Sequence, residues 1–287
     1  MLCSYCIQPM SSEAVFLHHG LWGRSGDLIN VATQLKEKHG CDYYLLSCNV
    51  GKTAQGIVSC GTRCLAAIRE VTDSLAPGTL VSFFGHSLGG LILLQALKIL
   101  SEESPTYFKD KGLVCETVFL ACSPLLGLTD SVWPIVRWAA EKLEGRTFDD
   151  LLFKTDDLEQ LCSEPLMDLL RGFTRLILFG NVIDDPAVSA ASSLLLQDNA
   201  SAIPDFDTLF IKLTDNPRPG SPSEGIAGRI RVKWRKLPWQ RYAFKIEREW
   251  FDFVGNAHNK IVMHARRDIF SRGTANVAQI VNVWKST

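Results

Sequence analysis

The stretch that decides the fold runs from residue 80 to residue 100, LVSFFGHSLGGLILLQALKIL. Leu80–Phe84 is a short apolar run typical of a buried strand, and Leu88–Leu100 is apolar on nearly all sides, as expected of a helix packed against a sheet. Between them lies Gly85-His86-Ser87-Leu88-Gly89, a G-x-S-x-G motif. A sharp strand-to-helix turn strains the serine backbone, and only small residues two positions away on either side avoid a clash. The stretch therefore predicts a turn that presents Ser87 at the end of a sheet.

The same alternation of strand and helix extends to both sides of this unit. The expected strands are Ala14–His18, Tyr43–Cys48, Leu80–Phe84, Cys115–Ala121 and Thr174–Gly180, and the expected helices are Gly26–His39, Gln55–Leu75 and Leu88–Leu100. This order is typical of an α/β protein with a mostly parallel central sheet flanked by helices. The length of 287 residues fits one large domain, and we predict a single domain over residues 1–287.

Three stretches depart from this alternation. Residues 128–173 exceed an ordinary connection, so we predict a helical insertion that forms a cap or lid. Residues 204–228 contain several prolines and predict an exposed loop. Arg229–Arg248 holds eight Lys or Arg residues against one Glu, and the alternation in Arg229–Arg235 predicts a strand with one basic face. That face is either a solvated hairpin surface or a peripheral contact with a membrane or lipid droplet, with Trp234 and Trp239 at the interface.

Composition and charge exclude several function classes. Hydrophobic residues make up 46% and charged residues 21%, which excludes a disordered chain or a polar coiled coil, and the net charge of −1 gives no basis for nucleic-acid binding. The start of the chain lacks the pattern of a secretory signal, so we expect a cytoplasmic protein with reduced thiols. Cys60 and Cys64 share a helix face and are expected to pack in the core, and Cys3 and Cys6 lack the further ligands of a zinc site. No phosphate-binding or dinucleotide motif is complete, so we expect no metal and no cofactor.

A serine hydroxyl needs a base to become a nucleophile, and the base needs an acid to orient it. The histidines that follow Ser87 are His258 and His264, and His258 is favoured because it lies in a loop-like stretch before a predicted strand. The acid is expected just past the strand that ends near Gly180, where Asp184 and Asp185 are the candidates. Pro186 disfavours a helical conformation at Asp185 and holds it in an extended turn.

The developing oxyanion and the substrate require further groups. Two backbone amides are expected to bind the oxyanion: that of Leu88, directly after the nucleophile, and that of Leu21 in His19-Gly20-Leu21-Trp22-Gly23. The apolar residues Trp22, Leu125, Trp133 and Trp138 are candidates for contact with the substrate. For Trp133 and Trp138 the alternative is an insertion helix that packs on the main domain without touching substrate.

These motifs, in this order, resemble those of the DUF676 serine esterases, a group of α/β-hydrolases that includes the Rog1-like lipases. The resemblance covers most of the chain and is carried by His19–Gly23, Thr53 with Gly56-Ile57, Phe84–Leu91, Asn181 with Asp185 and Val188, and Ala257–Val262. It implies that Asp185 rather than Asp184 is the acid. One departure concerns substrate choice: where the family commonly has Thr-Pro-His-Leu-Gly, this chain has Ser123-Pro124-Leu125-Leu126-Gly127.

The resemblance implies a lipid acyl ester as substrate, of the monoacylglycerol or lysophospholipid type, and lipid-droplet or endomembrane surfaces as the place of work. The expected reaction is ester hydrolysis through an acyl-enzyme, with Ser87, His258 and Asp185 as the triad. Two alternatives stay open: a thioesterase on acylated protein or acyl-CoA with the same triad, and a catalytically silent lipid-binding scaffold on the same fold.

Overall fold

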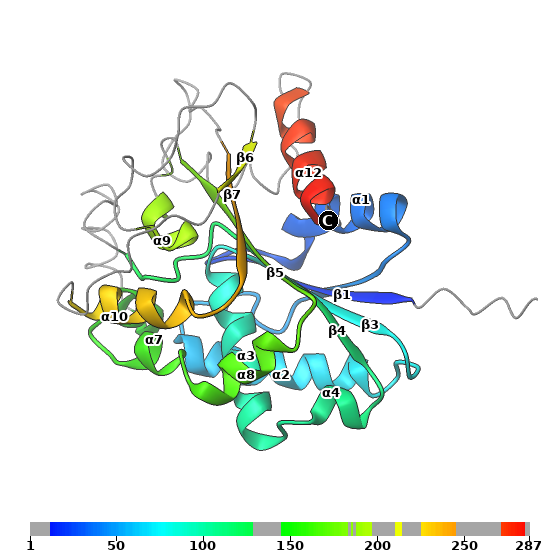
Figure 1. Cartoon of the computed structure of the whole chain (residues 1–287), viewed down its shortest axis with the longest axis horizontal. Coiled ribbons are helices and arrows are strands. Elements are labelled where there is room, and N and C mark those ends of the chain that lie inside the picture. Colours follow the sequence, from blue (N-terminus) through cyan, green and yellow to red (C-terminus); the bar gives the residue numbers. More distant parts are fainter. Residues whose placement is uncertain are drawn as a thin grey trace, which may run out of the picture.

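The computed structural model describes residues 12–128, 145–182, 185, 188–196, 210–213, 225–244 and 271–284. At its centre lies a seven-stranded sheet in the order β2-β1-β3-β4-β5-β7-β6 (Figure 1). The strands are β1 (Glu13–His18), β2 (Asp42–Leu46), β3 (Leu80–His86), β4 (Val114–Ala121), β5 (Arg175–Asn181), β6 (Phe210–Leu213) and β7 (Trp239–Phe244). Neighbouring strands pair in parallel except β6, which pairs antiparallel with β7. The expected mostly parallel sheet is thus present.

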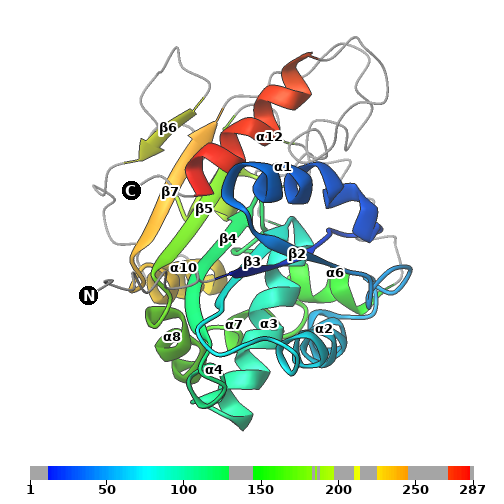
Figure 2. The ribbon, with the colours of Figure 1, turned by 90° about the vertical axis from the view of Figure 1, so that its right-hand side faces the viewer.

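Helices cover both faces of this sheet (Figure 2). They are η1 (Ser25–Leu28), α1 (Ile29–His39), α2 (Ile57–Thr72), α3 (Leu88–Glu103), α4 (Tyr107–Asp110), α6 (Arg146–Leu151), α7 (Asp157–Gln160), α8 (Glu164–Arg171), α9 (Ala190–Leu194), α10 (Gly225–Trp234) and α12 (Ser271–Trp284). The pair α1 and α12 lies on one face, and α2, α3 and α8 lie on the other. Among the helices of the described ranges, none combines the length and hydropathy needed to cross a membrane.

Successive side chains of each strand enter different cores, because neighbours along a strand point to opposite faces. Phe83 packs with α2 and α3, whereas Phe84 packs with α1 and α12, and both are fully buried. In the second core the indole of Trp284 stacks on Phe119 with 5.7 Å between ring centroids. Burial on both faces explains why the strands read as continuous apolar runs in the sequence.

The predicted insertion is helical where the structure describes it. Residues 145–173 contain α6, α7 and α8, and residues 129–144 lie outside the described ranges. The prediction of an exposed loop over residues 204–228 is wrong in two places, because Phe210–Leu213 forms β6 and α10 begins at Gly225. A four-residue edge strand leaves too short an apolar run to be recognised.

The predicted basic strand at Arg229–Arg235 is also wrong, because all of this segment except Arg235 lies in α10. Ile230 and Trp234 are four residues apart, so they share one helix face, and both are fully buried. Trp239, expected at a lipid interface, is buried in β7, and Arg229 pairs with Glu159 at 2.8 Å. A membrane contact through a basic strand face with Trp234 and Trp239 at the interface is therefore not supported by the described part of this segment.

Candidate active site

Four parallel strands end at the same edge of the sheet and gather the segments that follow them. Strands β1, β3, β4 and β5 are neighbours in the sheet, so their carboxyl ends lie side by side. Two backbone hydrogen bonds fix the connections: the Ser87 amide donates to Ala121 at 2.8 Å, and the Cys122 amide donates to Phe179 at 2.7 Å. This edge is where α/β sheets of this type bind ligands.

Ser87 lies between β3 and α3 in a strained backbone conformation. Its φ of 55° and ψ of −130° are unusual for a non-glycine residue, a strain that costs on the order of 1–3 kcal/mol. Flanking glycines permit the turn: a Cβ on Gly85 would come 2.4 Å from the Gly90 Cα, and one on Gly89 would come 2.3 Å from the His18 carbonyl oxygen. This is the geometry that the G-x-S-x-G spacing predicts, and it holds Ser87 at the sheet edge with 9% of its surface exposed.

The loop after β1 packs directly against the serine. A Cβ on Gly20 would lie 2.9 Å from the Ser87 Cβ and 3.3 Å from its Oγ, so only a glycine allows this approach. A turn closes the loop, because the Gly23 amide donates to the Gly20 carbonyl at 3.1 Å. The loop that sequence reasoning selected for oxyanion binding is therefore next to the nucleophile candidate.

Near Ser87, one backbone amide holds the loop in place, and two others are available to bind an oxyanion. The Trp22 amide donates to Thr53 Oγ1 at 2.9 Å, which holds Trp22 at a positive φ of 54°. The hydrogen bonds found within the described ranges include none donated by the Leu21 or Leu88 amide. Leu88 begins α3, where the first N–H groups lack partners in the helix and carry its positive end. These two amides are thus suited to an anionic oxygen near Ser87.

Two histidines support the loop through hydrogen bonds of their ring nitrogens. His18 Nδ1 donates to the His19 carbonyl at 2.8 Å, so His18 Nε2 accepts from the Asn49 side-chain amide at 2.9 Å. His19 Nδ1 donates to the Gly20 carbonyl at 2.9 Å, and within the described ranges the buried His19 Nε2 has no partner. Burial lowers the pKa of His19 below its usual value, because its charged form is poorly solvated.

Asp185 lies where the carboxyl ends of β4 and β5 meet. Its Oδ1 accepts the Val188 amide at 3.0 Å. Cys122 follows β4, and burial is the main cause that raises the pKa of its thiol. The nearby carboxylate of Asp185 is the second cause. Strand β5, which precedes Asp185, is separated from β3, which precedes Ser87, by β4 alone. Asp184, His258 and His264 lie outside the described residues, so the base is not placed and the choice between the two acids stays a prediction.

The predicted substrate contacts fall into three environments. Trp22 is 62% exposed and its ring lies 5.7 Å from that of Phe148 in α6. Leu125 is fully buried in the core on the α3 face of the sheet. Trp133 and Trp138 lie outside the described residues. A role in substrate binding stays a prediction for all four.

The insertion supports this site through contacts that no sequence pattern indicated. Thr147 of α6 donates to the Thr53 carbonyl at 2.7 Å, and its hydroxyl accepts the Gly56 amide at 2.9 Å. The buried carboxylate of Asp150 accepts the Ile57 amide at 2.9 Å, at the start of α2. Helix α6 therefore fixes the segment whose Thr53 holds Trp22. The resemblance pointed to Thr53, but no local pattern indicated Thr147 or Asp150.

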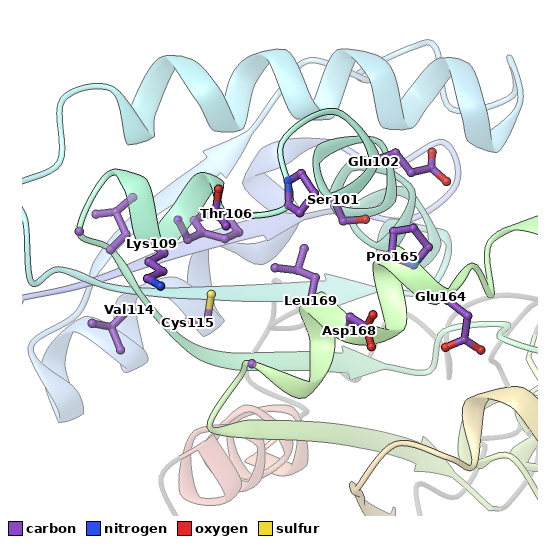
Figure 3. A pocket seen from close by; sticks show the side chains of 15 residues that line it. Ser101, Glu102, Thr106, Lys109, Val114, Cys115, Glu164, Pro165, Asp168 and Leu169 are labelled. Atoms are coloured by element: carbon purple, nitrogen blue, oxygen red, sulfur yellow. The ribbon is translucent and has the colours of Figure 1, made fainter.

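A groove of about 950 Å³ lies at the other end of the sheet (Figure 3). Its walls include Val114 and Cys115 at the start of β4, Glu102 of α3, and Asp168 and Leu169 of α8. Strand β4 has eight residues, so its two ends are about 23 Å apart. This groove is therefore remote from Ser87 and is not part of the candidate active site.

Comparison with known proteins gives a family match over most of the described core. The sequence model of a family described as "Putative serine esterase (DUF676)" matches residues 11–198. The chain belongs to this family. Its fold is that of the α/β-hydrolases, with a mostly parallel sheet and Ser87 at the strand-to-helix turn.

Curated relatives of this DUF676 chain carry lipase names. It is 33% identical over 156 residues to "Putative lipase ROG1" of Saccharomyces cerevisiae, which covers 52% of this chain and 22% of that protein. It is 29% identical over 175 residues to "Putative lipase YDR444W" of the same yeast, and this match covers 52% of this chain and 25% of that protein. The matched parts thus span a quarter or less of these relatives.

Solved structures with a similar arrangement include two lipid-cleaving enzymes by title. Aspergillus fumigatus lipase B is 16% identical with a TM-score of 0.46, over 63% of this chain and 40% of that one. Phospholipase PlaB from Legionella pneumophila is 16% identical with a TM-score of 0.43, over 63% of this chain and 42% of that one.

Proposed function

We propose that this chain hydrolyses carboxylic esters of lipids, of the monoacylglycerol or lysophospholipid type, through a serine acyl-enzyme. The observation that carries the proposal is the strained backbone of Ser87, with the Gly20 loop packed against it. Strain of this kind persists only where the surroundings enforce it, and it is common at nucleophiles. The lipase names of two curated relatives support a lipid ester as the substrate.

In the proposed reaction Ser87 Oγ attacks the ester carbonyl while His258 takes its proton. The carbonyl oxygen becomes an oxyanion, which accepts hydrogen bonds from the Leu21 and Leu88 amides. Collapse expels the alcohol, which receives the proton from His258, and leaves an acyl group on Ser87. Water then repeats the sequence and releases the fatty acid. Asp185 orients His258 and stabilises its charged form.

Labelling with a fluorophosphonate probe tests the nucleophile and the base without knowledge of the substrate. The probe phosphonylates activated serines, so we expect the native chain to be labelled and Ser87→Ala and His258→Ala to be unlabelled. His264→Ala is the matched control, and its labelling is expected to match the native chain. Absence of labelling of the folded native chain, with and without lipid vesicles, would contradict the proposal.

A panel of esters then tests the substrate class. We expect release of fatty acid from monoacylglycerols and lysophospholipids, and none from either substrate with the Ser87→Ala variant. Comparing kcat/KM for an acyl-CoA and an acyl-glycerol that carry the same acyl chain distinguishes a thioesterase from a lipase. Higher kcat/KM for the thioester would overturn the lipid-ester assignment while leaving the serine chemistry in place.

A further inference from the structure

Three reactive side chains meet beside the Gly20 loop, outside the groups proposed for ester cleavage. His18 ends β1, Cys48 follows β2, and Cys64 lies in the middle of α2. A ring nitrogen of His18 and the two Sγ atoms all lie within 4.8 Å of one another. His18 and Cys64 are fully buried, while Cys48 is half-buried. Two thiols from distant parts of the sequence are thus held close together, one within reach of solvent.

The surroundings of Cys48 favour its thiolate. Hydrogen bonding from the Cys64 thiol is the main factor that lowers the pKa of Cys48 to about 5. The Asn49 side-chain amide lies 3.6 Å from the Cys48 Sγ, and it is oriented because Asn49 Oδ1 accepts Arg63 Nε at 2.8 Å. A half-exposed thiolate among hydrogen-bond donors is the setting in which cysteines react with electrophiles.

Five other cysteines of the described ranges, Cys60, Cys64, Cys115, Cys122 and Cys162, have the opposite character. Burial raises the pKa of Cys115 and of Cys162 to about 12, and it raises that of Cys60 as well. Burial also raises the pKa of Cys64 well above its usual value, so Cys64 stays a thiol beside the Cys48 thiolate. A reactive thiolate with a protonated thiol next to it is the arrangement of a redox-sensitive pair.

We propose that Cys48 and Cys64 form a redox pair that hydrogen peroxide converts into an intramolecular disulfide. The Cys48 thiolate attacks one peroxide oxygen, and the O–O bond breaks to leave a sulfenic acid on Cys48 and hydroxide, which takes up a proton to become water. Cys64 then loses its proton and attacks the Cys48 sulfur. The S–O bond breaks, a second water leaves, and the two thiols have lost two electrons to the peroxide.

Oxidation is favoured over metal binding by the bonding of His18. Two thiols and an imidazole are ligand types that Zn²⁺ accepts. However, His18 Nε2 already accepts the Asn49 amide at 2.9 Å, and His18 Nδ1 is bonded to a backbone carbonyl. A metal ligated through His18 Nε2 would have to displace the first of these bonds, whereas disulfide formation leaves the imidazole in place.

The pair is connected to the oxyanion loop, and this consequence rests on the proposed function. Asn49, next to Cys48, bonds to His18, and Thr53 in the same segment accepts the Trp22 amide at 2.9 Å. A disulfide draws Cys48 toward α2 and displaces the segment that carries Asn49 and Thr53. We therefore expect oxidation to slow the phosphonylation of Ser87, and a reductant to restore it.

Peptide mapping tests the disulfide directly. The full chain is reduced, freed of metal with EDTA, treated with hydrogen peroxide, blocked with iodoacetamide and digested with trypsin without reductant. Trypsin places Cys64 in residues 64–69, Cys60 in residues 53–63, and Cys48 with Cys41 in residues 39–52. We expect a cross-link between residues 39–52 and 64–69 that disappears in Cys48→Ser and persists in Cys115→Ser. A cross-link that persists in Cys48→Ser, or none in the native chain, overturns the proposal.

Alkylation rates test the reactivity of Cys48 without any oxidant. At pH 6 Cys48 is expected to react with iodoacetamide at least about tenfold faster than the half-buried Cys115, because more of it is thiolate. Equal rates overturn the assignment of Cys48 as the attacking thiol. Fluorophosphonate labelling of the same oxidised sample tests the connection to Ser87: a formed disulfide with unchanged labelling overturns the connection alone. If the hydrolase proposal itself were wrong, the fluorophosphonate probe would fail to label even the reduced chain, so the two failures can be told apart.

Discussion

The Gly20 backbone lies against the side chain of Ser87, so close that a Cβ on residue 20 would come 2.9 Å from the Ser87 Cβ. One glycine therefore determines how near the oxyanion loop approaches the nucleophile. A second contact, the hydrogen bond from the Trp22 amide to Thr53 Oγ1, holds the same loop. The position of the loop relative to Ser87 is thus fixed by two contacts, at Gly20 and at Trp22, and each can be altered by a separate substitution.

Gly20→Ala is expected to slow fluorophosphonate labelling of Ser87 by about tenfold or more. The added methyl group must displace the loop or the serine, and a displacement of about 1 Å at a catalytic centre is costly. Gly26→Ala is the matched control, because a Cβ there meets no atom within 4 Å. Equal labelling of the two variants would show that the loop does not take part in the reaction.

Thr53→Val is expected to lower kcat/KM for a short-chain ester by about tenfold, because valine keeps the shape but removes the acceptor for the Trp22 amide. Thr53→Ser retains an oxygen at this place and is expected to stay near the native value. Steady-state kinetics with p-nitrophenyl butyrate measures both. If valine and serine behaved alike, the hydrogen bond would have no part in holding the loop.

Much of the fold could be predicted because strands buried on both faces leave continuous apolar runs. Leu80–Phe84 predicted most of β3, and the apolar helix that follows predicted α3. The segment at Arg229–Arg235 could not be assigned in this way, since alternation over seven residues also places Ile230 and Trp234 on one helix face. Edge strand β6 has only four residues and gave no usable signal.

The site could be predicted where its geometry is local. The spacing around Ser87 specifies a turn, and the glycines of the first loop specify a close approach. Contacts between distant segments leave no such pattern. Trp22 and Thr53 are 31 residues apart, and Thr147 is 94 residues from Thr53, so only the fold shows that α6 supports the oxyanion loop.

The free energy of unfolding is expected to fall as the pH drops below about 6.5, through the burial of His19. Its folded pKa is lowered, so between the folded and unfolded pKa values the unfolded state binds more protons, and stability is lost as pH falls. One such group contributes at most about 1.4 kcal/mol per pH unit. Urea unfolding between pH 5 and 7.5 measures this slope, and His19→Asn, which keeps a donor near Nδ1, is expected to flatten it. An identical slope in both proteins would contradict the assignment.

Asp185→Asn is expected to lower kcat by up to about 10⁴-fold, because an amide in place of the carboxylate favours the wrong tautomer of the base. The asparagine still offers Oδ1 to the Val188 amide, so the turn after β5 is expected to keep its shape. Asp184→Asn is the matched control, with the same change of charge one residue away. Steady-state kinetics, with circular dichroism to verify folding, compares them. A large loss in Asp184→Asn with a small one in Asp185→Asn would transfer the role to Asp184, and small losses in both would exclude a carboxylate of this turn from the triad.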